Sequence, residues 1–186
     1  MTTPRVAAIH DMSGFGRCSL TVAIPVLSAM GVQCCPLPTA FLSTHTGGFT
    51  GFTFLDMTEE MPKVAAHWQE LALRFHAIYS GFLASERQIG IVSDFIRTFR
   101  RSDTLVVIDP VMGDDGKAYQ TYTSALCSGM THLAELADVI TPNLTEAALL
   151  LGVPYESLPR DEAGRALARR FDFLPEGGRL VRRRVP

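Results

Sequence analysis

The sequence of 186 residues has few of the features that several classes of protein require. Its four cysteines do not have the spacing of a zinc or iron–sulfur site, and no apolar run reaches the ~18 residues of a membrane span. The formal net charge is only -2 and the pI is about 6.2, so there is no general attraction for nucleic acid or for an acidic membrane. The composition therefore favours a protein that acts on small molecules, with neither nucleic acid nor membrane among its partners.

Two common nucleotide-binding patterns are also missing. No Gly-x4-Gly-Lys-Ser/Thr pattern occurs, and Gly14-x-Gly16 lacks the third glycine of the dinucleotide fingerprint, so the sequence does not predict NAD binding. No secretory signal precedes the first predicted strand. We therefore expect a cytoplasmic protein whose cysteines are reduced and mostly buried. These cysteines are Cys18, Cys34, Cys35 and Cys127.

What is present is a regular alternation of strand and helix patterns. The 47% hydrophobic content allows one domain with a sizeable core. The alternation predicts parallel βαβ units and a doubly wound α/β fold with helices on both faces of the sheet. Apolar runs predict strands over 6–9, 32–37, 77–79, 105–108 and 139–140. Caps and periodicity predict helices over 19–30, 58–74, 85–101, 123–136, 144–151 and 159–171.

Two polar segments carry most of the functional information, because each directly follows a buried strand. They are Asp109-Pro110-Val111-Met112-Gly113 and Thr141-Pro142-Asn143-Leu144-Thr145-Glu146. Parallel strands end at one edge of an open sheet, where ligands bind, so Asp109 and Glu146 are expected to form a carboxylate pair there. Such a pair suits Mg²⁺ bound to a polyphosphate. The alternative is that both segments merely begin turns, and their common register makes that alternative the weaker one.

Three glycine-rich segments leave alternatives open. Residues 10–16 join a strand to a helix, where glycines let a ligand approach the backbone, or else form a tight turn near the helix cap. Residues 43–51 supply hydroxyls and an imidazole that suit a polar aromatic substrate, or else form a mobile surface loop. Residues 113–117 have too few ligands for a calcium site and are expected to form a solvated turn.

Five segments in order resemble the pyridoxal/pyridoxamine kinase family of the ribokinase superfamily. The resemblance implies a ribokinase-like fold and transfer of the γ-phosphoryl of ATP to the 5′-hydroxymethyl group of pyridoxal, pyridoxine or pyridoxamine. It also implies Mg²⁺ as a cofactor and a homodimer. The five segments are HDMSGFGRCS at 10–19, LSTHTG at 42–47, SGFL at 80–83, DPVMG at 109–113 and TPNLTE at 141–146.

The resemblance also implies individual roles. Phe82 would lie against the substrate ring, and Asp11 stands where relatives have a serine that meets this ring. Tyr119 would belong to a flap over the nucleotide, while Asp109 and Glu146 would hold Mg²⁺ through water. The full substrate side is Asp11, Ser13, Thr46, Gly47 and Phe82, and the full ATP side is Asp109, Tyr119, Thr141, Asn143 and Glu146.

The sequence departs from the family in one respect. It contains no Gly-Thr-Gly-Asp motif, whose amides hold the transferred phosphoryl group and whose aspartate deprotonates the alcohol, so no catalytic base is assigned. We therefore expect a kinase domain over 1–171 that is incomplete at its C-terminal side, an irregular Arg-rich tail over 172–186 that marks a truncation or frameshift, and impaired activity. The alternatives are a hydroxymethylpyrimidine kinase of thiamine synthesis or an inactive fragment that binds nucleotide or vitamer.

Overall fold

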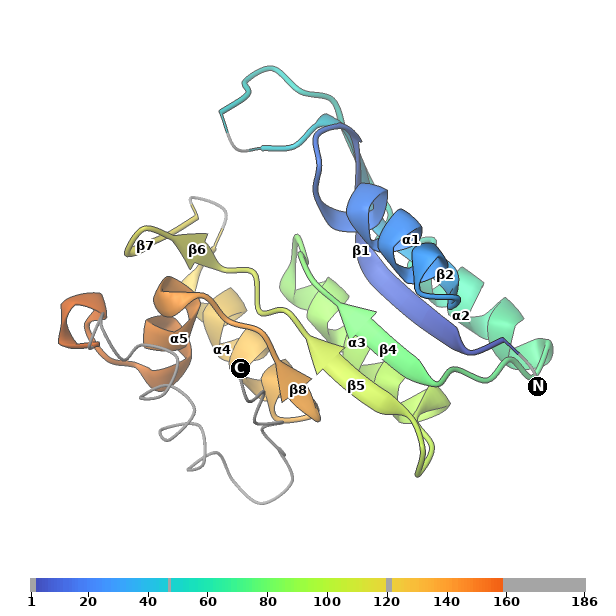
Figure 1. Ribbon diagram of the computed structural model, residues 1–186. Helices are drawn as coiled ribbons and strands as arrows, with labels where there is room; N and C mark the ends of the chain where they lie inside the picture. The colour runs from blue at the N-terminus through green and yellow to red at the C-terminus, as the bar shows by residue number, and fades with distance from the viewer. Residues whose placement is uncertain (1–2, 47, 120–121, 159–186) are drawn as a thin grey trace. The chain divides into compact units, whose positions relative to one another are not determined.

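The structure is a computed structural model that describes residues 3–46, 48–119 and 122–158. It divides into two compact units, Met1–Leu105 and Val106–Pro186, which are described in turn (Figure 1). In unit 1, β1 pairs in parallel with two other strands, and a short strand runs antiparallel at the edge. In the order β3-β2-β1-β4, the strands are β3 (Phe54–Asp56), β2 (Gln33–Thr44), β1 (Arg5–Phe15) and β4 (Ala77–Ser80).

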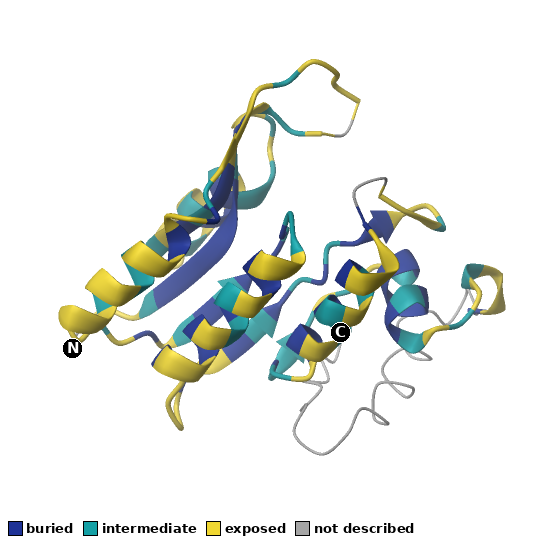
Figure 2. Cartoon of the chain, turned by 180° about the vertical axis from the view of Figure 1, so that it is seen from behind, coloured by how far each residue is buried: buried dark blue, intermediate teal, exposed yellow. Residues whose placement is uncertain are grey.

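Three helices cover this sheet on both faces. Helix α1 (Ser19–Ala29) lies on one face, and α2 (Met61–Glu70) and α3 (Glu86–Phe99) lie on the other (Figures 1 and 2). This placement follows from right-handed crossovers, because the chain steps from β1 to β2 in one direction and from β2 past β1 to β4 in the opposite one. The arrangement is doubly wound, as the sequence predicts.

The core of unit 1 lies between the sheet and these helices. Residues 6–10 of β1 are buried, and the strand is dark blue in Figure 2. Helix α3 turns an apolar face toward the sheet at the spacing expected of an amphipathic helix. Its buried apolar residues are Ile89, Val92, Phe95, Ile96 and Phe99.

Unit 2 contains a parallel pair of strands, β5 (Leu105–Ile108), whose first residue belongs to unit 1, and β8 (Val139–Ile140). Between them come a hairpin of β6 (Gly113–Asp114) and β7 (Lys117–Ala118), and helix α4 (Ser124–Ala134). Helix α5 (Leu144–Leu151) follows β8, and a 3-10 turn over Tyr155–Ser157 comes after it. Asn143 caps the start of α5, and Gly152 ends it in the left-handed conformation with φ 62°.

Three details of the secondary structure differ from the sequence-based prediction. Residues 10–15 were expected to turn the chain but continue β1, with a register shift between His10 and Met12. The predicted strand over 32–37 continues to Thr44, because its C-terminal half pairs with β1 and β3. The second helix runs over Met61–Glu70 instead of over 58–74.

The segment 113–117 contains the exposed turn that the sequence predicts, and this turn is the tip of a hairpin. Asp115 (48°) and Gly116 (78°) both have positive φ, the combination that a two-residue hairpin loop requires. All four cysteines are free, but they are half-buried instead of mostly buried. The predicted helix over 159–171 and the tail over 172–186 lie outside the described residues. Among the helices that are described, none has the length and apolar character needed to cross a bilayer.

Candidate functional site

In unit 1, the end of β1 places Asp11 and Ser13 together. Asp11 is buried, and its carboxylate accepts hydrogen bonds from the hydroxyls of Ser13 (2.9 Å) and Ser19 (2.5 Å). Ser19 begins α1 with φ 51°, a left-handed conformation that costs energy in a residue other than glycine. The Asp11 carboxylate therefore holds the strained first residue of α1 and faces the positive end of that helix.

The segments 10–16 and 43–51 form one local structure. The backbone N–H of His45 donates to the carbonyl of Phe15 (3.1 Å), and the rings of His45 and Phe49 make an edge contact. Gly16 has φ 139°, and a Cβ there would lie 2.6 Å from Cδ2 of His45, so this close approach requires glycine. Thr46 is exposed on this loop, and Gly47 lies outside the described residues.

Phe82 lies on the turn that follows β4, and it is half-buried. Its carbonyl accepts a hydrogen bond from the hydroxyl of Thr39 (3.2 Å). The preceding Gly81 donates its N–H to the carbonyl of Ile9 (3.0 Å), and a Cβ on Gly81 would overlap the imidazole of His10. Because β1, β2 and β4 are parallel, the last residues of β1 with Asp11 and the segments after β2 and β4 with Thr46 and Phe82 all lie toward the C-terminal edge of the unit 1 sheet.

His10 supports the Gly81 turn from below as a neutral side chain. Its ring is buried and makes an edge contact with Tyr79, with ring centroids 4.2 Å apart. Burial lowers the pKa of His10 to about 4, because the charged form would lose its hydration. An uncharged imidazole therefore packs against Gly81 beneath the turn that carries Phe82.

In unit 2, Glu146 joins the first turn of α5 to the segment that follows β5. Its carboxylate accepts the N–H groups of Asn143 (2.8 Å) and Met112 (3.3 Å). The side chain of Asn143 accepts the N–H of Glu146 (2.9 Å) in return, which completes a capping box. The amide of Asn143 also donates to the carbonyl of Gly113 (2.8 Å), so the two segments are fixed to each other.

The carboxyl groups of this cluster are poorly solvated and repel one another. The pKa of Glu146 is raised to about 7, chiefly by burial and also by the neighbouring charges of Asp109 and Asp114, against the hydrogen bonds from Asn143 and Met112. Burial also raises the pKa of Asp109, opposed by a hydrogen bond from Thr141. The pKa of Tyr119 is raised by burial and then by these same three carboxylates. All five residues predicted on the ATP side therefore lie in one cluster.

The cluster fits a divalent cation whose remaining ligands are water molecules and phosphate oxygens. Burial raises the pKa of both carboxyl groups, and the charge of Asp109 also raises that of Glu146, so a nearby cation would stabilise both ionised forms. Within the described part of the chain, no group of three or more His, Cys, Asp or Glu side chains could hold a metal by itself. This matches Mg²⁺, which binds through one or two carboxylates, water and phosphate oxygens.

Three residues of these clusters were not predicted from the sequence. Ser19 binds Asp11, Asp114 adds charge beside Glu146, and the hydroxyl of Thr145 accepts the N–H of Gly116 (2.8 Å). Ser19 and Thr145 belong to quoted motifs and Asp114 adjoins one, so their position in the chain was a usable signal. No local pattern indicates that Ser19 contacts a side chain eight residues earlier.

Comparison with known proteins decides the family. The family profile described as phosphomethylpyrimidine kinase matches residues 22–172. The chain belongs to this family. Curated relatives at similar identity comprise pyridoxal kinases and hydroxymethylpyrimidine/phosphomethylpyrimidine kinases, which confirms the resemblance stated from the five segments.

Solved structures confirm the ribokinase-like α/β fold. One protein from Bacteroides thetaiotaomicron, designated a phosphomethylpyrimidine kinase and crystallised with pyridoxal, has 53% identity and a TM-score of 0.86 over 92% of this chain. Pyridoxal kinase from Lactobacillus plantarum has 36% identity and a TM-score of 0.83 over 95% of this chain. Pyridoxal kinase from Deinococcus radiodurans is 27% identical over 187 residues, 97% of this chain. The chain spans 59%, 62% and 62% of the lengths of these three relatives.

Proposed function

We propose that this kinase-family protein serves the ATP-dependent phosphorylation of the 5′-hydroxymethyl group of a vitamin B6 compound, in the salvage of pyridoxal phosphate. The observation that carries the choice of substrate is the 53% identity to the Bacteroides thetaiotaomicron protein crystallised with pyridoxal. The cluster in unit 2 supports the nucleotide as the second substrate, because its carboxylates favour a bound cation. The homodimer and the cytoplasmic location expected from the sequence stay predictions.

In this proposal, unit 1 binds the pyridine ring. Phe82 supplies an aromatic surface for one face of the ring, and aromatic stacking is a common way to hold a flat heterocycle. Asp11, Ser13 and Thr46 supply the polar groups for the ring substituents, with Gly47 beside them on the loop. A carboxylate at position 11 offers only acceptors, so it favours a ligand with a donor at that point.

Unit 2 binds the nucleotide. Asp109 and Glu146 carry the negative charge that would hold and orient Mg²⁺. The Mg²⁺ would in turn compensate the negative charge of the phosphates. Thr141 and Asn143 are exposed at the start of α5, where their polar groups can meet phosphate oxygens or metal-bound water. Tyr119 is exposed after the β6–β7 hairpin, in a position to cover the nucleotide.

A Phe82→Ala variant tests the assignment of the ring. We expect its Kd for pyridoxal to rise about tenfold, because aromatic contact and buried ring surface are lost, while its Kd for Mg-ADP stays unchanged. Calorimetric titration of each ligand into the purified protein measures both values. Phe41→Ala, which removes a phenylalanine exposed on β2, is the matched control and should change neither. An equal loss for pyridoxal and Mg-ADP would contradict the placement of the ring against Phe82.

A hydroxymethylpyrimidine kinase is the second candidate, favoured by the description of the family profile. Its substrate is also a flat nitrogen heterocycle with a hydroxymethyl group, so it would use the same types of contact. The affinities of the protein for pyridoxal and for hydroxymethylpyrimidine distinguish the two candidates.

A further inference from the structure

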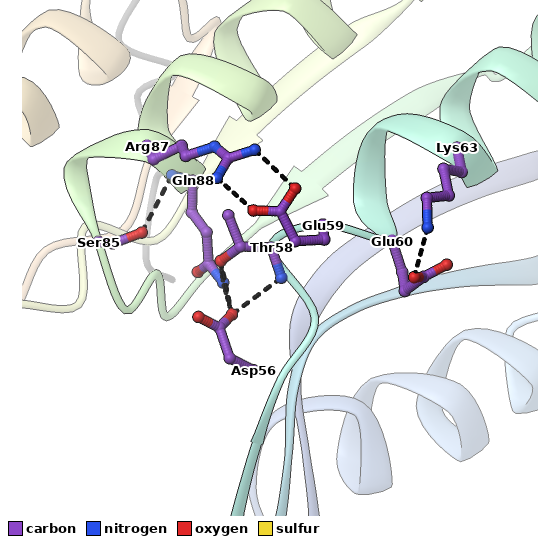
Figure 3. Close-up of polar contacts among 8 residues, drawn as sticks. All are labelled: Asp56, Thr58, Glu59, Glu60, Lys63, Ser85, Arg87 and Gln88. Atoms are coloured by element: carbon purple, nitrogen blue, oxygen red, sulfur yellow. Dashed lines mark hydrogen bonds and ion pairs between the residues drawn. The ribbon is translucent and has the colours of Figure 1, made fainter.

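Gln88 makes the most extensive side-chain hydrogen-bond network of unit 1 (Figure 3). The side chain is completely buried in the first turn of α3. The two N–H groups of its amide nitrogen are shared among three acceptors: the carbonyl of Thr39 (2.9 Å), the hydroxyl of Thr58 (2.9 Å) and the carboxylate of Asp56 (3.2 Å). Its amide oxygen accepts the N–H of Ala84 (2.8 Å). One side chain therefore joins β2, the connection between β3 and α2, and the turn before α3.

The turn that carries Phe82 is held by this network at two points. Thr39 accepts from Gln88 through its carbonyl and donates through its hydroxyl to the carbonyl of Phe82 (3.2 Å). Ala84, two residues after Phe82, donates to Gln88. The turn then ends at Ser85, whose hydroxyl accepts the N–H of Gln88 (3.2 Å) and caps α3. The backbone at and after Phe82 is thus fixed to β2 and to α3.

The chemistry of the network indicates that it fixes the relative positions of the segments more than it stabilises the fold. An amide buried this deeply gives up its hydration, and its hydrogen bonds do little more than compensate for that loss. An apolar side chain would fill the same volume between α3 and the sheet, but only a fully bonded amide fixes three segments at defined distances. Asp56 remains a charged acceptor, because the hydroxyl of Thr58 lowers the pKa of its carboxyl group. The nearby ion pair of Arg87 and Glu59 is exposed, so it adds little.

We propose that Gln88, acting through Thr39, is a positioning residue that holds the Phe82 turn in place and thereby sets the affinity for the ring-bearing substrate. This inference rests on the proposed function, because it takes Phe82 as the surface that meets the ring. Neither Gln88 nor Thr39 needs to touch the substrate.

Thr39→Val is the cleanest test, since it keeps the shape of the side chain and removes the bond to Phe82. Thr104→Val is a matched control: Thr104 is also buried, and its hydroxyl donates to the carbonyl of Phe75 (2.9 Å) at the N-terminal side of the same sheet. Both variants should lose similar stability in thermal denaturation. We expect only Thr39→Val to bind pyridoxal about fivefold to tenfold more weakly, with Mg-ADP affinity unchanged. Thr39→Ser, which keeps the hydroxyl, should restore the affinity.

Gln88→Glu provides a second variant, because it keeps the acceptor for Ala84, removes the donors to Thr39, Thr58 and Asp56, and adds a charge that the Asp56 carboxylate repels. It should weaken pyridoxal binding by at least as much as Thr39→Val, whereas Ser93→Ala on the same helix, which removes only a bond to Ile89, should not. Wild-type affinity for pyridoxal in a folded Thr39→Val variant, or an equal loss in Thr104→Val, would overturn the positioning role alone. Failure of the wild-type protein to bind pyridoxal would overturn the proposed function and this inference with it.

Discussion

A polypeptide of these 186 residues should form pyridoxal phosphate at least ~10²-fold more slowly than the same polypeptide joined to the C-terminal segment of a full-length relative. A primary alcohol is a poor nucleophile, and a positioned base commonly contributes about 10²–10⁴-fold to its reaction. Amides arranged around the transferred phosphoryl group can contribute a comparable factor. The family supplies both from a Gly-Thr-Gly-Asp motif, and the sequence contains none.

The rate is measured by the absorbance of pyridoxal phosphate, with both proteins at equal concentration and saturating ATP, Mg²⁺ and pyridoxal. A fusion whose motif aspartate is replaced by asparagine is the matched control, because it restores the missing chain without the base. It should remain close to the short form. Turnover by the short form within tenfold of the intact fusion would show that another residue accepts the proton, and the account of the chemistry would be wrong.

The second large effect concerns the carboxylates of unit 2. We expect the double variant Asp109→Asn with Glu146→Gln to bind Mg-ADP about 10–100-fold more weakly, since two charges that compensate a cation are lost. Each replacement keeps one acceptor oxygen, so glutamine at position 146 can still accept the N–H of Asn143 in a capping box and loses the longer bond from Met112, and the fold should survive. Calorimetry measures the affinity, and Asp94→Asn on the surface of α3 is the control for loss of a carboxylate away from this cluster. Unchanged affinity in the double variant would remove both residues from the nucleotide site.

The same carboxylates predict a pH dependence. Since burial raises the pKa of Glu146 to about 7, Mg-ADP must displace a proton below that pH, and its affinity should rise with pH and level off above about 7. Glu146→Gln should remove this rise. The stability of the ligand-free protein should depend on pH in the opposite direction. The pKa of Glu146 is about 7 in the folded protein and 4.5 in the unfolded chain, so its contribution to the free energy of unfolding is fully present below pH 4.5 and is lost as the pH rises through about 7. Urea denaturation of the ligand-free protein measures that loss.

Local chemistry explains which parts of the fold were predictable. The runs at 105–108 and 139–140 are apolar and β-branched, and the structure has strands at those positions. Ser85 and Gly152 mark helix ends because a hydroxyl satisfies an orphan N–H group and a glycine tolerates the left-handed conformation. The extension of β1 through residue 15 was not predictable in this way. Its polar residues are buried through bonds such as that of Ser13 to Asp11, which only the folded chain reveals.

Some contacts of the candidate site were likewise predictable from the sequence, and others were not. Asp109 and Glu146 were expected to form a pair because each follows a strand at a shared edge, and the structure places them close enough for their charges to interact. The Gln88 network was missed because its partners lie four to 49 residues away in the sequence. A buried glutamine on an amphipathic helix was the available signal, since such a residue needs partners that the sequence does not name.

The measurement that tests the central claim most directly is a pair of titrations of the wild-type protein, one with pyridoxal and one with hydroxymethylpyrimidine, both in the presence of Mg-ADP. The account predicts that pyridoxal binds with one site per chain and about tenfold or more tightly than the pyrimidine. Tighter binding of the pyrimidine, or no binding of either ring to the folded protein, would contradict it.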